Sequence, residues 1–495
     1  MDQETSAGQA IADAITELDV HRARALLAAQ KISSNEMTFQ RVRLAIEMSD
    51  CDSAEATART LPASPAVNAL ADLAQNCSRA MAGAQIVEDK ARGVWVRMQD
   101  EADKVLLPLI FDVAAKARDA IARDLGVELP RPLRIELVQD LFSLSAISGL
   151  PLKAAETTGT VAVARWGRVT MLSPRAAPLG YPWQDTLAHE IAHLGLTRAT
   201  RDFAPLWLQE GIAKNAEVRW RPARLLDDRI NADSVALQAL ITGESVGVEG
   251  LGQSIALLPS ADAASIAFAE VKSFMAYFIA TLGRPAFRLL LADLRGIGKR
   301  DPNPALVSVT GFELQYWIAQ WQNWLLTPSK DKPLPKDKPP APAPMPVAGA
   351  SDDPFEFARN ARLGALFFEA ERFRLAAEQF DQALKYDSDQ VTLRFDAARS
   401  WLAQSKDEQA QSDLGDLAGI SQLHGGWLAL HGRFLRQHGD DAAANASFDL
   451  AVAVDPFNPE AACEGQSKVL RHGQPKAPPR DAVRREICRA VDGVD

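Results

Sequence analysis

The sequence predicts an α+β domain with a small sheet, flanked by α-helical regions and followed by a C-terminal α-solenoid. Strand-like and helix-like patterns alternate between residues 94 and 172. A proline-rich stretch interrupts the chain at residues 330–346, and positions 34 residues apart repeat after it. At 495 residues the chain is long enough for about three domains.

Residues 1–91 have a helical, repeat-like pattern. Apolar residues recur three and four positions apart, as at Ala12, Ile15 and Leu18. A second group with the same spacing includes Ala54, Ala58 and Leu61. The Ala/Leu rhythm resembles degenerate helical repeats, and a plain helical cap on the next domain explains it equally well. Both alternatives stay open.

The pattern changes at Val94 into alternating strands and helices. Apolar and polar residues alternate in short runs, which is typical of half-buried strands. A long amphipathic helix is predicted between the first two runs, with Gly126 closing it. A hairpin with Trp166-Gly167 at its turn is predicted to come last. Strands are predicted at 94–98, 133–138, 160–164 and 169–172, and helices at 101–125 and 141–148.

The stretch 183–193, WQDTLAHEIAH, contains an H-E-x-x-H pattern formed by His189, Glu190 and His193. On a helix, residues four apart lie on one face, about 5–6 Å apart at Cβ. Both imidazoles can therefore reach one zinc ion at about 2.0–2.1 Å. Glu190 is placed to act as general base for a zinc-activated water. Pro182 predicts the start of this helix, and Gly195 its end.

A second helix, 205–217, reads PLWLQEGIAKNAE. HEIAH followed by W-L-x-E-G-x-A resembles the gluzincin zinc metallopeptidases, and most of all the bacterial peptidase MA-like families. The resemblance implies a thermolysin-like domain over residues 94–326, with Glu210 as the third zinc ligand. It also implies a supporting role for Glu217. Asp185 and Glu217 are candidates to orient an imidazole from outside the ligand set.

The same resemblance implies hydrolysis of peptide bonds in a peptide or protein substrate. The edge at residues 157–164 is predicted to pair with an extended substrate backbone. In the family a Tyr stabilises the oxyanion, but Phe268 occupies the best-matching position here, and Tyr277 is the substitute candidate. The rival interpretation is a catalytically retired peptidase fold that serves as a binding scaffold.

Residues 243–247 match the G-x-S-x-G pattern of serine hydrolases. A nucleophile elbow needs a strand before the serine and a helix after it. The following residues, VEGLG, are too rich in glycine for a helix, and no histidine occurs between His193 and His424. We therefore reject a serine hydrolase site. Helices are predicted at 232–240, 263–282, 286–294 and 314–326.

Residues 327–354 are predicted to be a proline-rich, semi-rigid linker. In residues 355–458, small and large apolar positions recur with a period of 34 residues, which resembles three tetratricopeptide repeats. Their concave face is predicted to bind a protein partner, and a purely structural appendage is the alternative. Residues 459–495 are predicted to form a capping tail. Equivalent positions include Gly364, Ala398 and Gly432, and also Phe380, Leu414 and Phe448.

Charge and apolar content argue against a nucleic-acid-binding protein and against a membrane-spanning protein. A net charge of −10 without a dense basic stripe argues against a nucleic-acid surface. No apolar run approaches the roughly 20 residues of a membrane-spanning helix, so no membrane span is expected. The start, MDQETSAGQA, is acidic and polar and does not resemble a signal peptide. The chain as written is therefore expected in the cytoplasm.

The four cysteines leave the compartment open. Cys51 and Cys77 lie near one end of the chain, and Cys463 and Cys488 near the other. Four free thiols suit a cytoplasmic protein, whereas two disulfides suit a periplasmic or extracellular protein whose signal was trimmed. A bridge between Cys463 and Cys488 is predicted in the second case.

Overall fold

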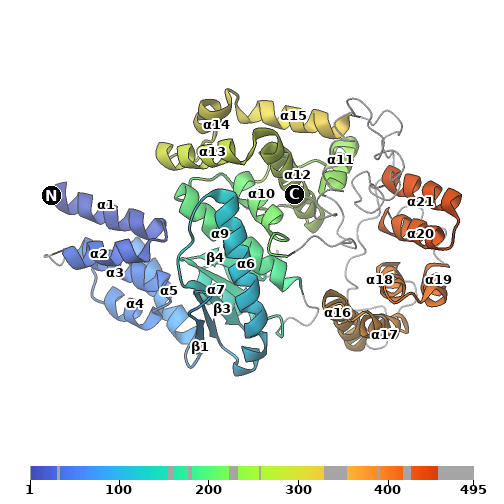
Figure 1. The fold of residues 1–495 in the computed structure, drawn as a ribbon. Coiled ribbons are helices and arrows are strands. Elements are labelled where there is room, and N and C mark those ends of the chain that lie inside the picture. The colour runs from blue at the N-terminus through green and yellow to red at the C-terminus, as the bar shows by residue number, and fades with distance from the viewer. Residues whose placement is uncertain are drawn as a thin grey trace. The chain divides into compact units, whose positions relative to one another are not determined.

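The computed structural model of the protein describes residues 2–30, 34–153, 160–176, 181–221, 232–252, 254–255, 258–327, 354–386, 391–415 and 425–454. The chain divides into two compact units. The first comprises residues 1–177, 181–222 and 246–321, and the second comprises residues 178–180, 223–245 and 322–495 (Figure 1). The predicted sheet and both helices of the H-E-x-x-H region belong to the first unit.

The N-terminal region forms five helices. Ser34, Asp50 and Ser64 each accept a hydrogen bond from a backbone N–H three residues later, which fixes where three of them begin. A disulfide between Cys51 and Cys77 joins two of these helices. The helices are α1 (Asp2–Thr16), α2 (Val20–Ala29), α3 (Asn35–Glu47), α4 (Cys51–Ala58) and α5 (Pro65–Ala80).

The sheet of the first unit has five strands in the order β1-β2-β3-β5-β4. β2 pairs with β3 and β3 with β5 in parallel, and both outer pairs are antiparallel. Strand β4 is therefore an edge strand of the sheet. The strands are β1 (Gln85–Asp89), β2 (Val94–Met98), β3 (Leu133–Val138), β4 (Ala162–Arg165) and β5 (Arg168–Leu172).

The structure differs from the sequence prediction in two elements near the start of the sheet. The expectation that residues 1–91 are entirely helical is wrong at β1, which is a short strand. This segment is extended because its backbone groups pair with those of β2, a partner outside residues 1–91. The predicted single helix 101–125 is instead a 3₁₀ helix, η1 (Glu101–Leu106), followed by α6 (Leu107–Leu125). Pro108 lies in the first turn of α6, where a missing N–H costs little.

Helices cover both faces of the sheet. α6 and α9 (Trp183–Thr200) contact strands β2, β4 and β5 on one face. On the other face, α7 (Leu141–Ser148) contacts the sheet and α5. Here Cys51, Cys77 and Met81 share one apolar cluster with residues of β3 and α7. The N-terminal helices are therefore part of the fold that positions the candidate site.

A buried ionic network ties those helices to the sheet. Glu136 of β3 is fully buried and pairs with Arg97 of β2 and Arg168 of β5. Arg97 also donates to the carbonyl of Ser49 at 3.0 Å, and Arg168 to that of Ile46. Burial opposes ionisation of Glu136, but the two guanidinium groups outweigh it and hold the pKa of this carboxyl below its usual range.

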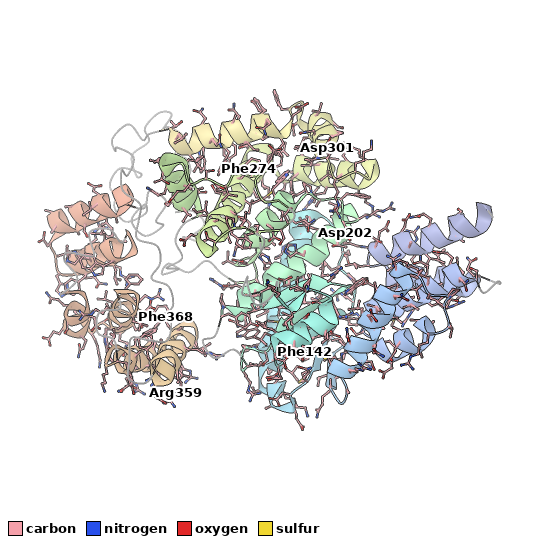
Figure 2. The ribbon with its side chains drawn as sticks, turned by 180° about the vertical axis from the view of Figure 1, so that it is seen from behind. Phe142, Asp202, Phe274, Asp301, Arg359 and Phe368 are labelled. Carbon is pink, nitrogen blue, oxygen red and sulfur yellow. A yellow bond between two sulfur atoms is a disulfide. The ribbon has the colours of Figure 1, made fainter. Side chains whose placement is uncertain are left out.

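The remaining helices of the first unit pack through aromatic side chains. Trp207 and Trp321 both make edge-on contacts with Phe274, which Figure 2 labels. Trp321 Nε1 donates to Ser273 Oγ at 2.9 Å. The helices are α10 (Leu206–Ala216), α12 (Ala261–Leu282), α13 (Arg284–Ile297), α14 (Asn303–Thr310) and α15 (Leu314–Leu326), whose last residues belong to the second unit.

Within α12, residues 262–282 are long and apolar enough to cross a membrane by length and composition, with a mean hydropathy of 1.3. The sequence pattern predicts no apolar run of this length, so this stretch differs from that expectation. The central aromatic residues Phe274 and Phe278 are fully buried in the fold. A core helix passes the same test of length and composition, so the finding is weak evidence for a membrane span.

The second unit contains α11 (Ala232–Thr242) and three successive helix pairs in the predicted repeat region. Within two of these pairs a glycine meets a phenylalanine ring, Gly364 with Phe380 and Gly432 with Phe448. The linker 328–353 and residues 455–495, including Cys463 and Cys488, lie outside the described residues. The pairs are α16 (Pro354–Glu369) with α17 (Phe373–Leu384), α18 (Val391–Leu402) with α19 (Asp407–Gly415), and α20 (Gly425–Gln437) with α21 (Asp441–Val454).

Candidate metal centre

Helix α9 carries the H-E-x-x-H residues and begins directly after Pro182. It does not end at Gly195, as the sequence predicted, but continues to Thr200 and stops at Arg201 with φ of 55°. A Cβ at Gly195 would lie 2.4 Å from Ile121 Cγ2 of α6. Gly195 is therefore a site of close helix packing, where any side chain would push α6 away from α9.

Helix α10 brings Glu210 to α9. Its Gly211 faces α12 closely, because a Cβ there would lie 2.7 Å from the carbonyl oxygen of Val271. Trp207 of α10 is buried against Phe274 and Phe278 of α12. These contacts hold α10 in place while α9 contacts it directly.

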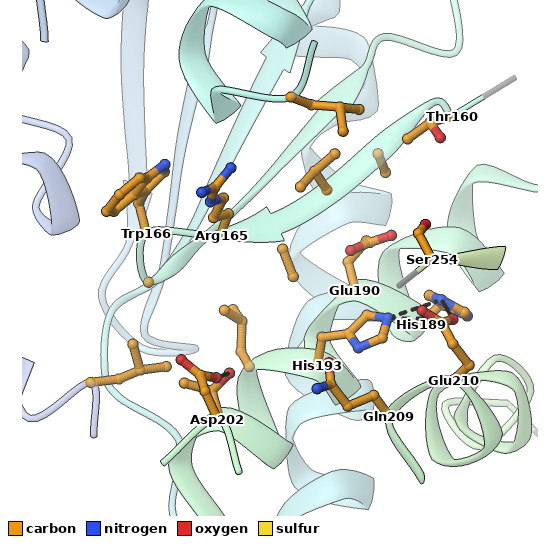
Figure 3. A pocket seen from close by; sticks show the side chains of 18 of the residues that line it. Thr160, Arg165, Trp166, His189, Glu190, His193, Asp202, Gln209, Glu210 and Ser254 are labelled. Carbon is orange, nitrogen blue, oxygen red and sulfur yellow. Dashed lines mark hydrogen bonds and ion pairs between the residues drawn. The ribbon is translucent and has the colours of Figure 1, made fainter. Parts of the chain in front are cut away.

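Three donor atoms converge between the two helices. His189 Nε2 and His193 Nε2 are 3.2 Å apart, and Glu210 Oε2 lies 3.5 Å from the first and 3.9 Å from the second (Figure 3). Two atoms bound to zinc at about 2.0–2.1 Å in a tetrahedral arrangement are separated by about 3.3–3.4 Å. The observed separations and the two-nitrogen, one-oxygen donor set therefore fit a zinc ion.

The charges around His189 also favour a cation. Glu217 Oε1 lies 3.1 Å from His189 Nδ1 and 2.7 Å from Lys214 Nζ. Burial alone would lower the pKa of His189, but hydrogen bonds with Glu210 and Glu217 raise it to about 9. Burial likewise opposes ionisation of Glu217, but His189 and Lys214 lower the pKa of Glu217 to about 2.

Asp185 and Glu190 both lie on α9, near the two histidines. Asp185, in the first turn of α9, accepts hydrogen bonds from Trp220 Nε1 at 2.8 Å and Arg221 Nε at 3.4 Å. It thereby joins α9 to the segment after α10. Glu190 is buried and lines the same cavity as the three donors.

Tyr277 does not line the cavity, whereas Phe268 does. The two residues are nine positions apart on α12, which is two and a half turns, so they lie on opposite faces of the helix. The described structure therefore does not bring the Tyr277 hydroxyl to the site. The cavity wall at this point is the Phe268 ring, over which Lys214 Nζ lies 4.9 Å from the ring centroid.

The cavity has a volume of about 530 Å³ and extends well beyond the donor atoms. One wall is edge strand β4, and another comes from α1 and α3 of the N-terminal region. This second wall cannot be predicted from the sequence, because no local pattern in residues 1–91 shows which helix face meets the site. Residues of that wall include Ile15, Leu18, Arg43 and Glu47.

The G-x-S-x-G stretch has no nucleophile-elbow context. The preceding element is the helix α11 rather than a strand, and turn residues follow it. These neighbouring elements agree with the rejection of a serine hydrolase site from the sequence.

Comparison with known families gives one match. Residues 113–327 match the model of the Peptidase MA superfamily. The matched segment contains α9 and α10, and it supports a gluzincin-like peptidase domain of the hydrolase class in this part of the chain. Members of such families typically hold zinc, which agrees with the donor set described above.

Solved structures give weaker similarity. The structure of native yeast LTA4 hydrolase shares 11% identity and a TM-score of 0.32, covering 82% of this chain and 66% of that one. The structure of yeast LTA4 hydrolase in complex with Bestatin shares 12% identity and a TM-score of 0.33, and the match covers 82% of this chain and 67% of that one. The chain spans about two thirds of the length of these proteins. TM-scores this low do not support any inference about function. No curated protein matches the chain.

Proposed function

We propose that this chain is a zinc-dependent metallopeptidase. The observation that carries the proposal is the convergence of His189 Nε2, His193 Nε2 and Glu210 Oε2 within 4.8 Å of one another. These atoms open into a cavity that Glu190 also lines. Bound zinc would supply Lewis acidity, which activates water and polarises a scissile carbonyl.

Glu190 is the general base in this proposal. It precedes Ile191 on the buried face of α9 and is not one of the three converging donors. Its carboxylate accepts a proton from water and passes it to the leaving amine. Glu190 is buried, which strengthens its electrostatic interactions with the groups around it.

Glu217 and Asp185 have positioning roles. With Nδ1–H of His189 donating to Glu217, the His189 Nε2 lone pair is free and points toward the other donors. Asp185 holds Trp220 and Arg221, which follow α10, and so keeps Glu210 close to α9.

The substrate is a peptide or protein held in extended form. Among the described strands, β4 is the last of the sheet, so its outer edge has no strand partner in that part of the chain. Ala162, Val163 and Ala164 of this strand line the cavity. An extended peptide can pair with that edge by β-augmentation. Of the predicted edge 157–164, residues 157–159 lie outside the described residues.

The three helix pairs of residues 355–458 are proposed to be tetratricopeptide repeats whose concave face binds a protein partner. Support comes from the 34-residue period together with the glycine–phenylalanine contacts inside two pairs. Residues 94–326 would be the peptidase domain, 327–354 the linker and 459–495 the cap.

A second candidate function is a retired peptidase that acts as a scaffold. Phe268 faces the cavity where the resemblance implies a tyrosine, and Tyr277 lies on the other side of α12. Oxyanion stabilisation would then lack a phenolic donor. In this case zinc would have a structural role and the repeats would carry the function.

The deciding experiment uses the Glu190→Gln variant. Zinc content, measured by metal analysis, should stay at about one ion per chain, since Glu190 is not one of the three donors. Hydrolysis of a peptide library should fall about 10²–10⁴-fold, because an amide cannot accept the proton. His189→Ala and Glu210→Ala are the matched controls and should lose the metal. A zinc-loaded wild-type protein that cleaves nothing would favour the scaffold.

A further inference from the structure

The cavity that contains the donor atoms has a second end built largely from other elements. In Figure 3, Arg165, Trp166 and Asp202 lie on one side, and Glu190, His189 and Glu210 lie on the other. The cavity is also lined by Ile15 of α1, by Leu18 just after α1 and by Glu47 of α3. Leu18 and Glu47 both approach Gly167, next to Trp166 at this end. Part of this end therefore comes from residues far from α9 in sequence.

Glu47 is the unusual group at this end. Its Oε2 atom is buried and has no hydrogen-bond partner among the described residues, although the residue as a whole is partly exposed. Oε2 lies against the backbone of the β4–β5 turn, since a Cβ at Gly167 would be 2.3 Å from it. The fold therefore encloses this carboxyl oxygen but provides no hydrogen-bond donor to it among the described residues.

Burial and the position on the helix both disfavour a carboxylate at Glu47, and Arg168 and Arg43 offset them only in part. Glu47 is the last residue of α3, where the helix dipole disfavours negative charge. Burial raises the pKa of Glu47 to about 8, against the opposing effect of Arg168 and Arg43, and Asp202 raises it further. A buried acid held at such a cost is typical of a functional site.

The nearby cations are occupied elsewhere. Arg168 donates to Glu136 and to the carbonyl groups of Ile46 and Ile147. Arg43 donates to Gln40 Oε1 at 3.0 Å.

Arg165 is occupied in the same way. It donates to the carbonyl of Ser148 and lies over the Trp166 ring. Asp202 accepts from Thr197 Oγ1 at 2.6 Å, and its φ of 62° is strained for a residue with a side chain. Two carboxyl groups therefore share this end with arginines whose hydrogen bonds go to other groups.

We propose that Glu47, assisted by Asp202, forms a specificity subsite for a basic side chain of the substrate. The inference rests on the proposed peptidase function and names its substrate class. Leu18 and Trp166 line the cavity beside Glu47 and can cover the aliphatic stem of a lysine or arginine. The head group would then pair with Glu47, which ionises when a cation arrives. The free α-amine of a substrate is the other source of the same charge.

The test uses full-length zinc-loaded protein and peptides that are acetylated and amidated. One residue at a time is lysine, norleucine or glutamate, so that charge changes while the stem stays similar. At one position, lysine should exceed norleucine about 10- to 100-fold in kcat/KM, as expected for a hydrogen-bonded charge. Glu47→Gln should bring this ratio close to one. Glu36→Gln, on the same helix but outside the cavity, should leave it unchanged.

Each outcome has a meaning. An unchanged lysine preference in Glu47→Gln, or a preference for glutamate, overturns the subsite. A preference seen only with free N-termini assigns the bound cation to the α-amine and overturns the side-chain subsite.

Calorimetric binding of the same peptides to Glu190→Gln, with and without Glu47→Gln, separates the two proposals. Loss of lysine-peptide affinity in the double variant supports the subsite even if the wild type cleaves nothing. Cleavage without any charge preference supports the peptidase alone.

Discussion

The two helical regions that flank the peptidase-like segment bury their apolar faces against different partners. In the N-terminal region, Cys77 and Met81 share a core with Ile147 of α7 and Val138 of β3. In the C-terminal region, Phe434 and Phe448 belong to a core formed only by residues of the helix pairs. Both regions are rich in alanine and leucine, so composition does not distinguish them.

The difference shows that a helical rhythm alone does not define a module. The N-terminal helices accept hydrogen bonds from Arg97 and Arg168 of the sheet and line the candidate active-site cavity. They are therefore part of the domain that would carry the chemistry. Two of the three C-terminal pairs share one packing arrangement, in which a glycine accommodates a phenylalanine ring from the next helix.

Deletion of either region should give the largest contrast. Removing residues 1–80 should unfold the protein and abolish zinc binding, because Arg97 and Arg168 would lose carbonyl acceptors that now lie in α3 and after it. A chain that ends at Thr327 should fold and keep zinc, since the proline-rich linker follows it. Circular dichroism and metal content check both. A folded, zinc-binding N-terminal deletion would contradict the distinction drawn here.

The buried ionic network should show the next largest effect. Glu136→Gln leaves two buried guanidinium groups without their carboxylate, which should lower the free energy of unfolding by about 3–5 kcal/mol. The matched control is Glu378→Gln, whose pair with Arg374 has side chains 44% and 64% exposed. It should cost less than about 0.5 kcal/mol. Urea unfolding compares the two, and equal costs would remove the contrast between the regions.

Glu47 should make the stability of the first unit fall as pH rises. Its pKa is about 8 in the folded protein and about 4.5 when exposed, so the folded state binds more protons between these values. Stability from this group is present below about pH 4.5 and is lost as pH rises through about 8. Glu47→Gln should remove this slope and raise the melting temperature at pH 9. Glu36→Gln, which is exposed, should melt like the wild type at every pH.

Glycine substitutions should give the smallest effects and test the repeat packing. Alanine at Gly364 would place Cβ 2.5 Å from the Phe380 ring, against 3.0 Å from Phe448 at Gly432. Gly364→Ala should therefore cost more, within about 1–3 kcal/mol. Gly296→Ala in α13 meets nothing within 4 Å and should gain up to about 1 kcal/mol. Thermal melts give the order, and a stabilising Gly364→Ala would contradict the packing described.

The sequence by itself determined what depends on neighbouring residues. The i, i+4 spacing of His189 and His193 places them on one helical face wherever α9 lies. Strands 94–98 and 133–138 have the bounds that the sequence predicts, although nearly every residue of both is buried because helices cover both faces of the sheet. The role of Glu210 came from resemblance to a family rather than from any local pattern.

Only the tertiary structure decided the features that depend on distant partners. β1 exists because β2 pairs with it, and Gly195 lies inside a helix because α6 packs on it. Phe268 rather than Tyr277 lines the cavity because one face of α12 is turned toward it. Glu47 becomes an enclosed acid only when α3 packs against the β4–β5 turn. Each of these depends on contacts between residues far apart in sequence, which local periodicity does not encode.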